Sequence, residues 1–369
     1  MFLLVNNRAE EGYSPGGTRH EVELWRNRCY KSSALKDYPA SIEGMGRTPM
    51  YVRCRAMRPH DVCKAVAIIA ADPVLGPRYG NALGELGAVW LSLLGSEAAR
   101  SIILEYSSGT GAEIVGIGFS AFVSDDFFRE LKTPPFCWAG PKITHRVTRG
   151  ASPLLTNKQV RDANSNGGLN VVVWEGAVPA TAQCMPEVHN AMLASFLEQH
   201  RGFLVKEMLG HGTSVVGLEA TFRMGNLFLS SVDGSYIAYM EKTPQELLST
   251  PHFIGISREL ARSRLGTWIG SLFDYHAPRF GLRPSEQRLL LAALCGGTDE
   301  DLADELSISL SAVKKTWRSI YERVAGYAAE LVPISASVRD GAAERGKEKK
   351  QRLLAYLREH PEELRPAAL

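Results

Sequence analysis

The sequence has little of what marks a membrane, secreted or strongly charged protein. Its 369 residues contain no apolar run long enough to cross a bilayer, and the apolar start at 1–5 is far shorter than a signal peptide. Its six cysteines include no closely spaced pair, which argues against a disulfide framework or zinc site and for reduced thiols. The net charge of only +2 excludes a protein that coats nucleic acid with its whole surface. We therefore expect a soluble, cytoplasmic protein without membrane contact, cofactor or metal.

A chain of this length predicts about two to three domains, and the segment 282–324 predicts three short helices by itself. The glycine pair at 296–297 ends the first helix. Thr298 caps the second helix with Asp301 as its capping-box partner, and Ser309 caps the third. The segment is therefore a compact all-α module.

Apolar side chains recur along the third predicted helix at spacings of four, three and four, namely Val313, Trp317, Ile320 and Val324. This spacing puts them on one buried stripe. The opposite side carries one hydroxyl and three cations, Ser311, Lys314, Lys315 and Arg318. A rigidly held helix with outward cations suits the DNA major groove. The competing interpretation is a small three-helix bundle with a solvated basic face.

The spacing of the whole segment resembles the LuxR-type (GerE-like) helix-turn-helix family. The matching positions are Leu282, Glu286, Leu289, Leu290, Gly296, Thr298, Asp301, Leu302, Ala303, Leu306, Ile308, Ser309, Val313, Lys314, Ile320, Arg323 and Val324. The resemblance implies a homodimer on double-stranded DNA with paired half-sites. The implied DNA-binding residues are Ser311, Lys314, Lys315, Thr316 and Arg318. Arg283, Ala312 and Thr316 depart from the family pattern, and these departures concern the base contacts rather than the fold.

The region after the first 50 residues predicts a strand, two helices and two strands, over 51–57, 61–71, 82–94, 101–106 and 113–123. This order is similar to the opening half of the GNAT acyltransferase fold. GNAT enzymes hold the diphosphate of acetyl-CoA with an Arg/Gln-x-x-Gly-x-Gly/Ala loop before a helix. No stretch after Val123 fits that pattern. We therefore expect no enzyme and no catalytic residue, with an acyl-CoA-binding or acyltransferase-like enzyme carrying a DNA-binding appendage as the alternative.

The middle of the chain continues the mixed pattern. It predicts a buried strand, a long amphipathic helix and a three-stranded meander, over 169–174, 186–209, 215–222, 227–232 and 236–240. Four aromatic residues are candidates for a pocket that takes an apolar signal, or for ordinary core: Trp138, Trp174, Phe196 and Phe203. The pattern indicates a sensor-like α+β domain.

The sequence argues against three other candidate sites. His189, His200 and His211 recur every eleven residues, which on one helix is about 16.5 Å and too far to share a metal ion. The acid pair at 125–126 lacks the other residues of a receiver domain. The Trp-x-x-x-Tyr pattern of acyl-homoserine-lactone receptors is also missing. The input of the N-terminal domain thus stays open between a small-molecule and a protein signal.

We predict five regions: a partly ordered leader (1–48), the α+β sensor-like domain (49–250), a linker helix (251–278), the helix-turn-helix domain (279–334) and a basic helical tail (335–369). The linker helix, centred on 257–273, either transmits a signal and pairs two copies or simply covers the sensor core. The tail is either a solvated helix or an extra contact to the DNA backbone. The fold class is therefore an α+β, GNAT-like domain followed by an all-α helix-turn-helix domain. The function expected first is a sequence-specific transcriptional regulator.

Overall fold

A single seven-stranded sheet forms the centre of the N-terminal part. The computed structural model describes residues 52–108, 111–212, 227–230, 250–263, 268–294, 296–332 and 342–367. The strands are β1 (Val52–Arg55), β2 (Ala99–Ser108), β3 (Gly111–Val123), β4 (Leu169–Ala177), β5 (Val205–Gly210), β6 (Leu227–Ser230) and β7 (His252–Ser257), in the order β1-β2-β3-β4-β5-β7-β6. Strands β4 and β5 pair in parallel, and every other neighbouring pair in this sheet is antiparallel.

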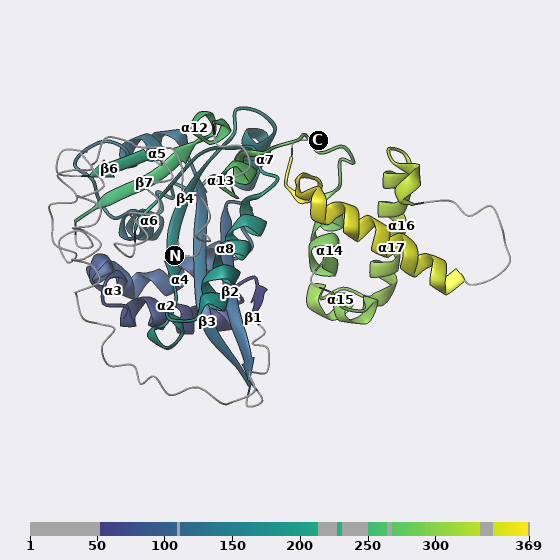
Figure 1. Cartoon of the computed structure of the whole chain (residues 1–369), viewed down its shortest axis with the longest axis horizontal. Helices are drawn as coiled ribbons and strands as arrows, with labels where there is room; N and C mark the ends of the chain where they lie inside the picture. The colour runs from purple at the N-terminus through teal and green to yellow at the C-terminus, as the bar shows by residue number, and fades with distance from the viewer. Residues whose placement is uncertain are drawn as a thin grey trace, which may run out of the picture.

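Helices cover both faces of this sheet (Figure 1). One face carries α2 (Val62–Ala71), α3 (Leu75–Tyr79), α4 (Leu83–Leu93), α5 (Asp125–Leu131) and α6 (Ala139–Thr148). The other face carries α7 (Asn157–Ser165), α8 (Pro186–His200), α12 (Arg258–Arg262) and α13 (Trp268–Phe273). Strand β3 shows why both faces are covered: Phe119 packs against the first group and Phe122 against the second. Successive strand side chains point to opposite faces, and both sets are apolar here.

The long helix predicted over 186–209 is wrong in its second half. Helix α8 ends at His200, and 205–210 is strand β5. Gly202 has a φ of +80°, a left-handed conformation that glycine adopts without strain and that ends helices. This glycine lies inside the predicted helix, so the prediction does not include the parallel β4–α8–β5 unit.

The helix predicted over 257–273 is also corrected, because it is two helices, α12 and α13. The Ser263 N–H and hydroxyl both bond to the Leu260 carbonyl and close α12. Ala261 and Leu272 are buried in the cluster around Phe203. These helices therefore cover the sheet core, as one of the two interpretations held.

Several predicted segments lie outside the described residues, namely the leader 1–48 and the strands at 215–222 and 236–240. The strand predicted over 227–232 is β6. Helices α5, α6 and α7 were not predicted at all. Their short amphipathic stretches follow one another too closely for hydrophobic spacing to separate them.

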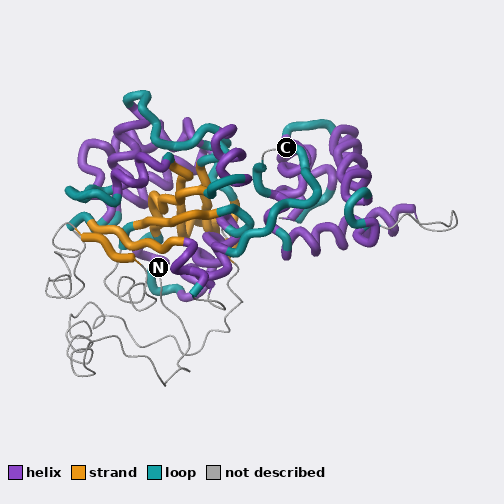
Figure 2. Tube along the Cα trace, turned by 90° about the horizontal axis from the view of Figure 1, so that it is seen from above, coloured by secondary structure: helices purple, strands orange, loops and turns teal. Residues whose placement is uncertain are grey.

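The three helices predicted in 282–324 are present as α14 (Pro284–Leu294), α15 (Asp299–Leu306) and α16 (Leu310–Ala325). The capping box of Thr298 and Asp301 and the cap by Ser309 are confirmed. So is the buried stripe of α16, since Val313, Trp317, Ile320 and Val324 are 0–5% exposed. The helices form a lobe beside the sheet domain (Figure 2).

The C-terminal tail is neither solvated nor separate. Helix α17 (Ala342–Glu359) buries Leu353, Leu354 and Leu357 in the same core as α14 and α16. The short helix η5 (Pro361–Leu364) follows it. The Glu363 carboxylate there accepts hydrogen bonds from the backbone N–H groups of Arg279 and Phe280, both at 2.9 Å. The apolar residues of the tail thus complete the C-terminal core, which corrects the solvated-helix interpretation.

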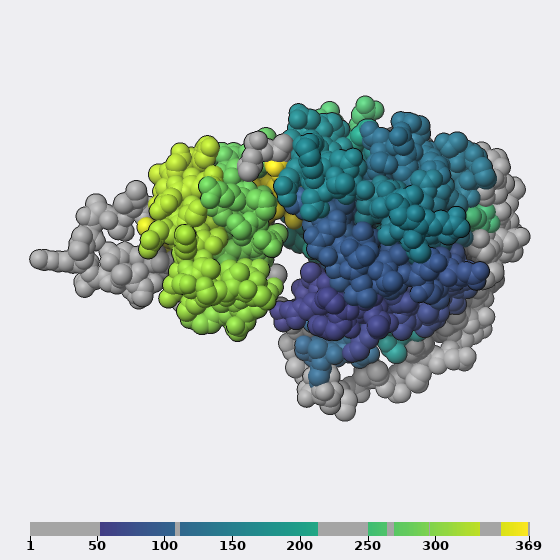
Figure 3. Space-filling view, turned by 180° about the vertical axis from the view of Figure 1, so that it is seen from behind, coloured from purple at the N-terminus to yellow at the C-terminus, as the bar shows by residue number. Residues whose placement is uncertain are grey.

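The end of the chain also joins the two lobes, and Figure 3 shows the C-terminal residues at their junction. Arg365 donates from Nε to the Arg201 carbonyl at 2.8 Å and from Nη2 to the Glu198 carbonyl at 2.5 Å. Asn164 Nδ2 donates to the Pro366 carbonyl at 2.7 Å. These bonds tie the tail to the C-terminal end of α8 and to α7.

Candidate active site

Strand β4 continues beyond its pairing with β5. Their pairing runs from Leu169 opposite Val205 to Val172 opposite Leu209, whereas β4 continues to Ala177. Among the described residues no strand pairs with β4 on that side beyond Val172. Ligands of open α/β sheets bind beyond the carboxyl ends of parallel strands. The edge of β4 beyond Val172 is therefore the candidate ligand site of this sheet.

A bulge in β4 brings two neighbouring side chains to the same partner. Phe119 pairs with Glu175 and Ser120 with Val173, so Trp174 is the extra residue. The Tyr79 hydroxyl donates to Glu175 Oε1 at 2.8 Å and accepts from Trp174 Nε1 at 3.1 Å. Helix α3 thereby supplies a phenol that holds the carboxyl group of β4.

Glycine at the start of α6 makes room for this pair. A Cβ at Gly140 would lie 2.4 Å from the Tyr79 hydroxyl oxygen and 2.8 Å from Glu175 Oε1. Any other residue would therefore push helix α6 away from the carboxyl group.

Burial controls the protonation of the pair. It raises the pKa of Glu175 to about 7, although the Tyr79 hydrogen bond and the charge of Arg78 act in the opposite direction. Burial and the neighbouring Glu175 charge raise the pKa of Tyr79 well above 10. At neutral pH Tyr79 keeps its proton, while Glu175 readily gains or loses one. Such a carboxyl group has the property of a general acid or base.

A wall of aromatic and imidazole rings adjoins the pair. The Arg78 guanidinium lies 3.9 Å from the Trp138 ring centre, and its Nη2 donates to the Gly212 carbonyl at 3.0 Å. His211 Nε2 accepts from the Ala139 N–H at 2.8 Å, so its proton is on Nδ1, which donates to the His252 carbonyl at 2.6 Å. Burial lowers the pKa of His211 well below 6.5 and that of His252 to about 4. Both rings are neutral supports.

The junction between β4 and α8 does not fit the diphosphate of coenzyme A. Residues 178–185 contain no glycine, lysine or arginine. Helix α8 then begins with Pro186, which has no N–H to donate, and has Glu187 in its first turn. Free N–H groups and positive charge are what hold a diphosphate at a helix start, and both are lacking at this junction.

The residues singled out in the sequence are spread over several places. Trp174 meets Trp90 and Phe119 edge-on in the core. Phe203 packs in the same cluster as α13, and Phe196 lies in a pocket beside α8. The proposed aromatic pocket is therefore not formed. The described residues contain no group of three side chains able to hold a metal ion. In the same part of the chain no helix is long and apolar enough to cross a membrane.

The five residues predicted to bind DNA all lie on α16. Ser311, Lys314, Lys315 and Arg318 are exposed and Thr316 is partly buried. The Thr316 hydroxyl donates to the Ala312 carbonyl at 2.9 Å, and the hydroxyls of Ser309 and Ser311 are 2.9 Å apart. The structure thus brings the three cations together on one free surface.

Sequence reasoning missed Glu175 and Tyr79. One signal was available, because Glu175 is the only charged residue in the stretch 169–177, which is apolar apart from Asn170. A carboxylate in a buried strand needs a partner or a raised pKa. The partner, Tyr79, could not be identified, since it lies 96 residues away.

Comparisons with known proteins assign no family to the chain. No family model and no curated protein matches the chain. Similar solved structures include an uncharacterized protein from Bacillus halodurans, with 9% identity over 61% of this chain and 93% of that one and a TM-score of 0.35. An aminoglycoside acetyltransferase AAC(6')-Ib in complex with coenzyme A has 12% identity over 59% and 100% of the two chains, with a TM-score of 0.30. A GNAT-like decarboxylase in complex with isobutyryl-CoA has 12% identity over 56% and 98%, with a TM-score of 0.31.

The neighbours with a named activity thus include an acetyltransferase and a GNAT-like decarboxylase, each matched over nearly its whole length. They contradict the expectation that the chain is no enzyme, because the neighbours with a named activity are acetyltransferases and a decarboxylase. None of them supports a LuxR-type module.

Proposed function

We propose that the chain is an acyltransferase-like enzyme that carries a DNA-binding appendage. The observation that carries the first half is the edge of β4 beyond Val172, which no described strand pairs with on the β5 side, beside the Glu175–Tyr79 pair. An extended chain with amide groups can pair with such an edge as an added strand does. The pantetheine arm of an acyl thioester is a chain of this kind. Its acyl group would then lie near Glu175.

The reaction needs one proton acceptor, and Glu175 has the right pKa for it. An amine attacks the thioester carbonyl carbon, and the Glu175 carboxylate takes the proton that the nitrogen loses. The C–S bond breaks, and the protonated carboxyl returns that proton to the departing thiolate. Tyr79 stays protonated and fixes the carboxyl group. Because the β4–α8 junction lacks a diphosphate cradle, the donor is held by its pantetheine arm.

Calorimetry with two thioesters tests this proposal. Acetyl-CoA and acetyl-pantetheine, which lacks the diphosphate, are titrated into the full chain. We expect both to bind, with affinities within about tenfold of each other, since one strong charge-assisted contact would make a larger difference. Absence of binding by both would refute the enzyme proposal.

Thiol release with a panel of amines then tests Glu175. The Glu175→Gln variant keeps the shape and the Tyr79 hydrogen bond, so donor binding should persist while release falls by about a hundredfold or more. Glu113→Gln, at an exposed position on β3, is the matched control. Equal rates in Glu175→Gln and the unaltered chain would remove Glu175 from the mechanism.

The second half of the proposal is binding of double-stranded DNA by a dimer through α16. The exposed cations Lys314, Lys315 and Arg318 favour it, because phosphate attraction needs free positive charge on a rigid helix. A LuxR-like role as a transcriptional regulator in the cytoplasm follows from the resemblance described above. Fluorescence anisotropy with labelled DNA over a salt series is the test. A salt-independent signal would argue against it.

A further inference from the structure

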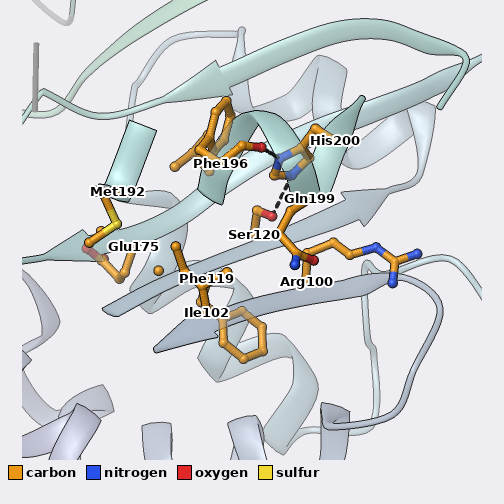
Figure 4. A pocket seen from close by; sticks show the side chains of 12 residues that line it. Arg100, Ile102, Phe119, Ser120, Glu175, Met192, Phe196, Gln199 and His200 are labelled. Atoms are coloured by element: carbon orange, nitrogen blue, oxygen red, sulfur yellow. Dashed lines mark hydrogen bonds between the residues drawn. The ribbon is translucent and has the colours of Figure 1, made fainter. Parts of the chain in front are cut away.

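A pocket lies between α8 and the sheet, and part of its lining is the stretch of β4 that extends beyond β5 (Figure 4). Val173, Glu175 and Gly176 line it, and all three follow Val172, the last β4 residue paired with β5. Glu175 therefore belongs to two sites at once, since it bonds to Tyr79 and also lines this pocket. The pocket is thus continuous with the candidate active site.

The end of the pocket near Glu175 is otherwise apolar. Met192 of α8 lies at this end in Figure 4, and Ile102 of β2 also lines the pocket. Strand β3 contributes Gly118 to the lining. A Cβ at this glycine would lie 2.8 Å from Ile102 Cγ1 and 3.8 Å from Met192 Sδ. The missing side chain therefore helps to leave the space between α8 and the sheet that the pocket occupies.

The other end of the pocket is polar. His200 Nδ1 donates to a carbonyl of its own helix at 2.8 Å, so its Nε2 accepts the Ser120 hydroxyl proton, also at 2.8 Å. Burial lowers the pKa of His200 to about 4, so the ring is neutral at pH 7. Arg100 lines the pocket as well, but its guanidinium lies over the rings of Phe122 and Phe203, which are outside the lining. The polar end is thus closed by a serine and a histidine that already bond to each other.

The size of the pocket limits the length of a ligand. Its volume is about 350 Å³, which includes the open space at its mouth. Small-molecule sites measure roughly 300–1,000 Å³, so this pocket is near the lower limit and suits a short chain. A chain that starts at Glu175 buries its first carbons against Met192 and Ile102. A longer chain would reach the Ser120–His200 pair, where polar atoms replace the apolar lining and burial gains less.

We propose that this pocket receives the acyl group of the donor thioester and makes the enzyme selective for short acyl chains that are longer than acetyl, such as butyryl. The inference rests on the proposed function, because it requires the donor to lie along β4 with its carbonyl carbon near Glu175. An acetyl group has only its methyl carbon to bury in the pocket, whereas a butyryl group has two further carbons. Met192 and Ile102 are therefore specificity-determining residues.

Calorimetric titration of the unaltered full chain with acetyl-, butyryl- and hexanoyl-pantetheine tests the inference. Each buried CH₂ group contributes roughly fourfold in affinity, so butyryl-pantetheine should bind about fifteenfold more tightly than acetyl-pantetheine. Hexanoyl-pantetheine should gain less per carbon, since its last carbons reach the polar end. Equal affinity for the acetyl and butyryl compounds would overturn the inference and leave the proposed function standing. Absence of binding by all three would refute both.

The Met192→Ala variant tests where the chain lies. It enlarges the pocket at the Glu175 end, so the affinity for hexanoyl- relative to butyryl-pantetheine should rise at least about fourfold, the contribution of one buried CH₂ group. Both affinities are measured on the same variant, so a general loss of stability does not change their ratio. Met57→Ala replaces a buried methionine in the core on the other face of the sheet, and as the matched control it should leave the ratio unchanged. An unchanged ratio in Met192→Ala would place the acyl chain elsewhere and overturn the inference.

Discussion

In the sheet domain the Glu175 carboxyl and the rings of His200 and His252 are buried, whereas the cations of α16 point into solvent. Burial shifts the pKa of the first group by changing which protonation state is stable. Exposure leaves the second group available to a polyanion. Charge in the sheet domain thus suits proton transfer, and charge on the helices suits DNA contact.

Replacing Trp317 with Ala should give the largest difference in stability between the helical lobe and the sheet domain, because it removes the largest side chain of the α16 stripe. Trp317 is 5% exposed and stacks on Tyr321 at 5.6 Å. We expect Trp317→Ala to lower the stability of the helical lobe by about 3 kcal/mol. That value is the lower end of the usual range, because the buried indole N–H has no partner within the described chain. Chemical denaturation followed by circular dichroism measures it.

Tyr327 supplies the control for this prediction, since it is 61% exposed. Tyr327→Ala should change the stability very little. If Trp317→Ala also abolished thioester binding, the two lobes would unfold together as one cooperative unit.

The raised pKa of Glu175 can be tested by measuring the stability of the protein at several pH values. Its pKa is about 7 in the folded protein against 4.5 for the ordinary group. Between these values the folded protein binds the proton and the unfolded chain does not, so stability falls as pH rises from about 4.5 to about 7. The loss is about 3 kcal/mol for a shift of this size.

Glu175→Gln removes this titration, so its stability relative to the unaltered chain should grow across the same pH window. The pKa values of His200 and His252 are lowered to about 4, so these two residues make the folded protein less stable as pH falls below 6.5. Both proteins share that effect, and it cancels in the difference. Denaturation curves at several pH values give the result, and parallel curves would show that Glu175 is not buried as described.

Replacing Lys314 and Lys315 with Ala tests whether the exposed cations of α16 contact DNA. If both lysines meet phosphates, the slope of log affinity against log salt should flatten by about two. The affinity should fall by roughly tenfold, or about 1.4 kcal/mol. Lys64 and Lys158 are exposed lysines of the sheet domain, and the double Ala variant there is the matched control. Equal salt slopes in both double variants would remove α16 as the contact surface.

The two parts also differ in how much their sequences predict. The caps at Thr298 and Ser309 and the stripe of α16 are local signals within a few residues, and the structure confirms them. The candidate site in the sheet domain depends on distant partners. Tyr79 and Glu175 are 96 residues apart and meet only in the folded domain, where the bulge in β4 at Trp174 lies next to Glu175. No spacing pattern contains that information, and misplacing Gly202 hid the parallel pair itself.

One capping motif occurs in both parts and gives the smallest but most closely matched test. Thr156 caps α7 with Gln159, and Thr298 caps α15 with Asp301, each in a complete capping box. Replacing either threonine by Ala should cost about 1 kcal/mol, because one backbone N–H loses its acceptor. The Thr156 variant should weaken the sheet domain alone and the Thr298 variant the helical lobe alone, as measured by hydrogen exchange. A loss of protection in both lobes from either variant would show that the Arg365 junction makes them one cooperative unit.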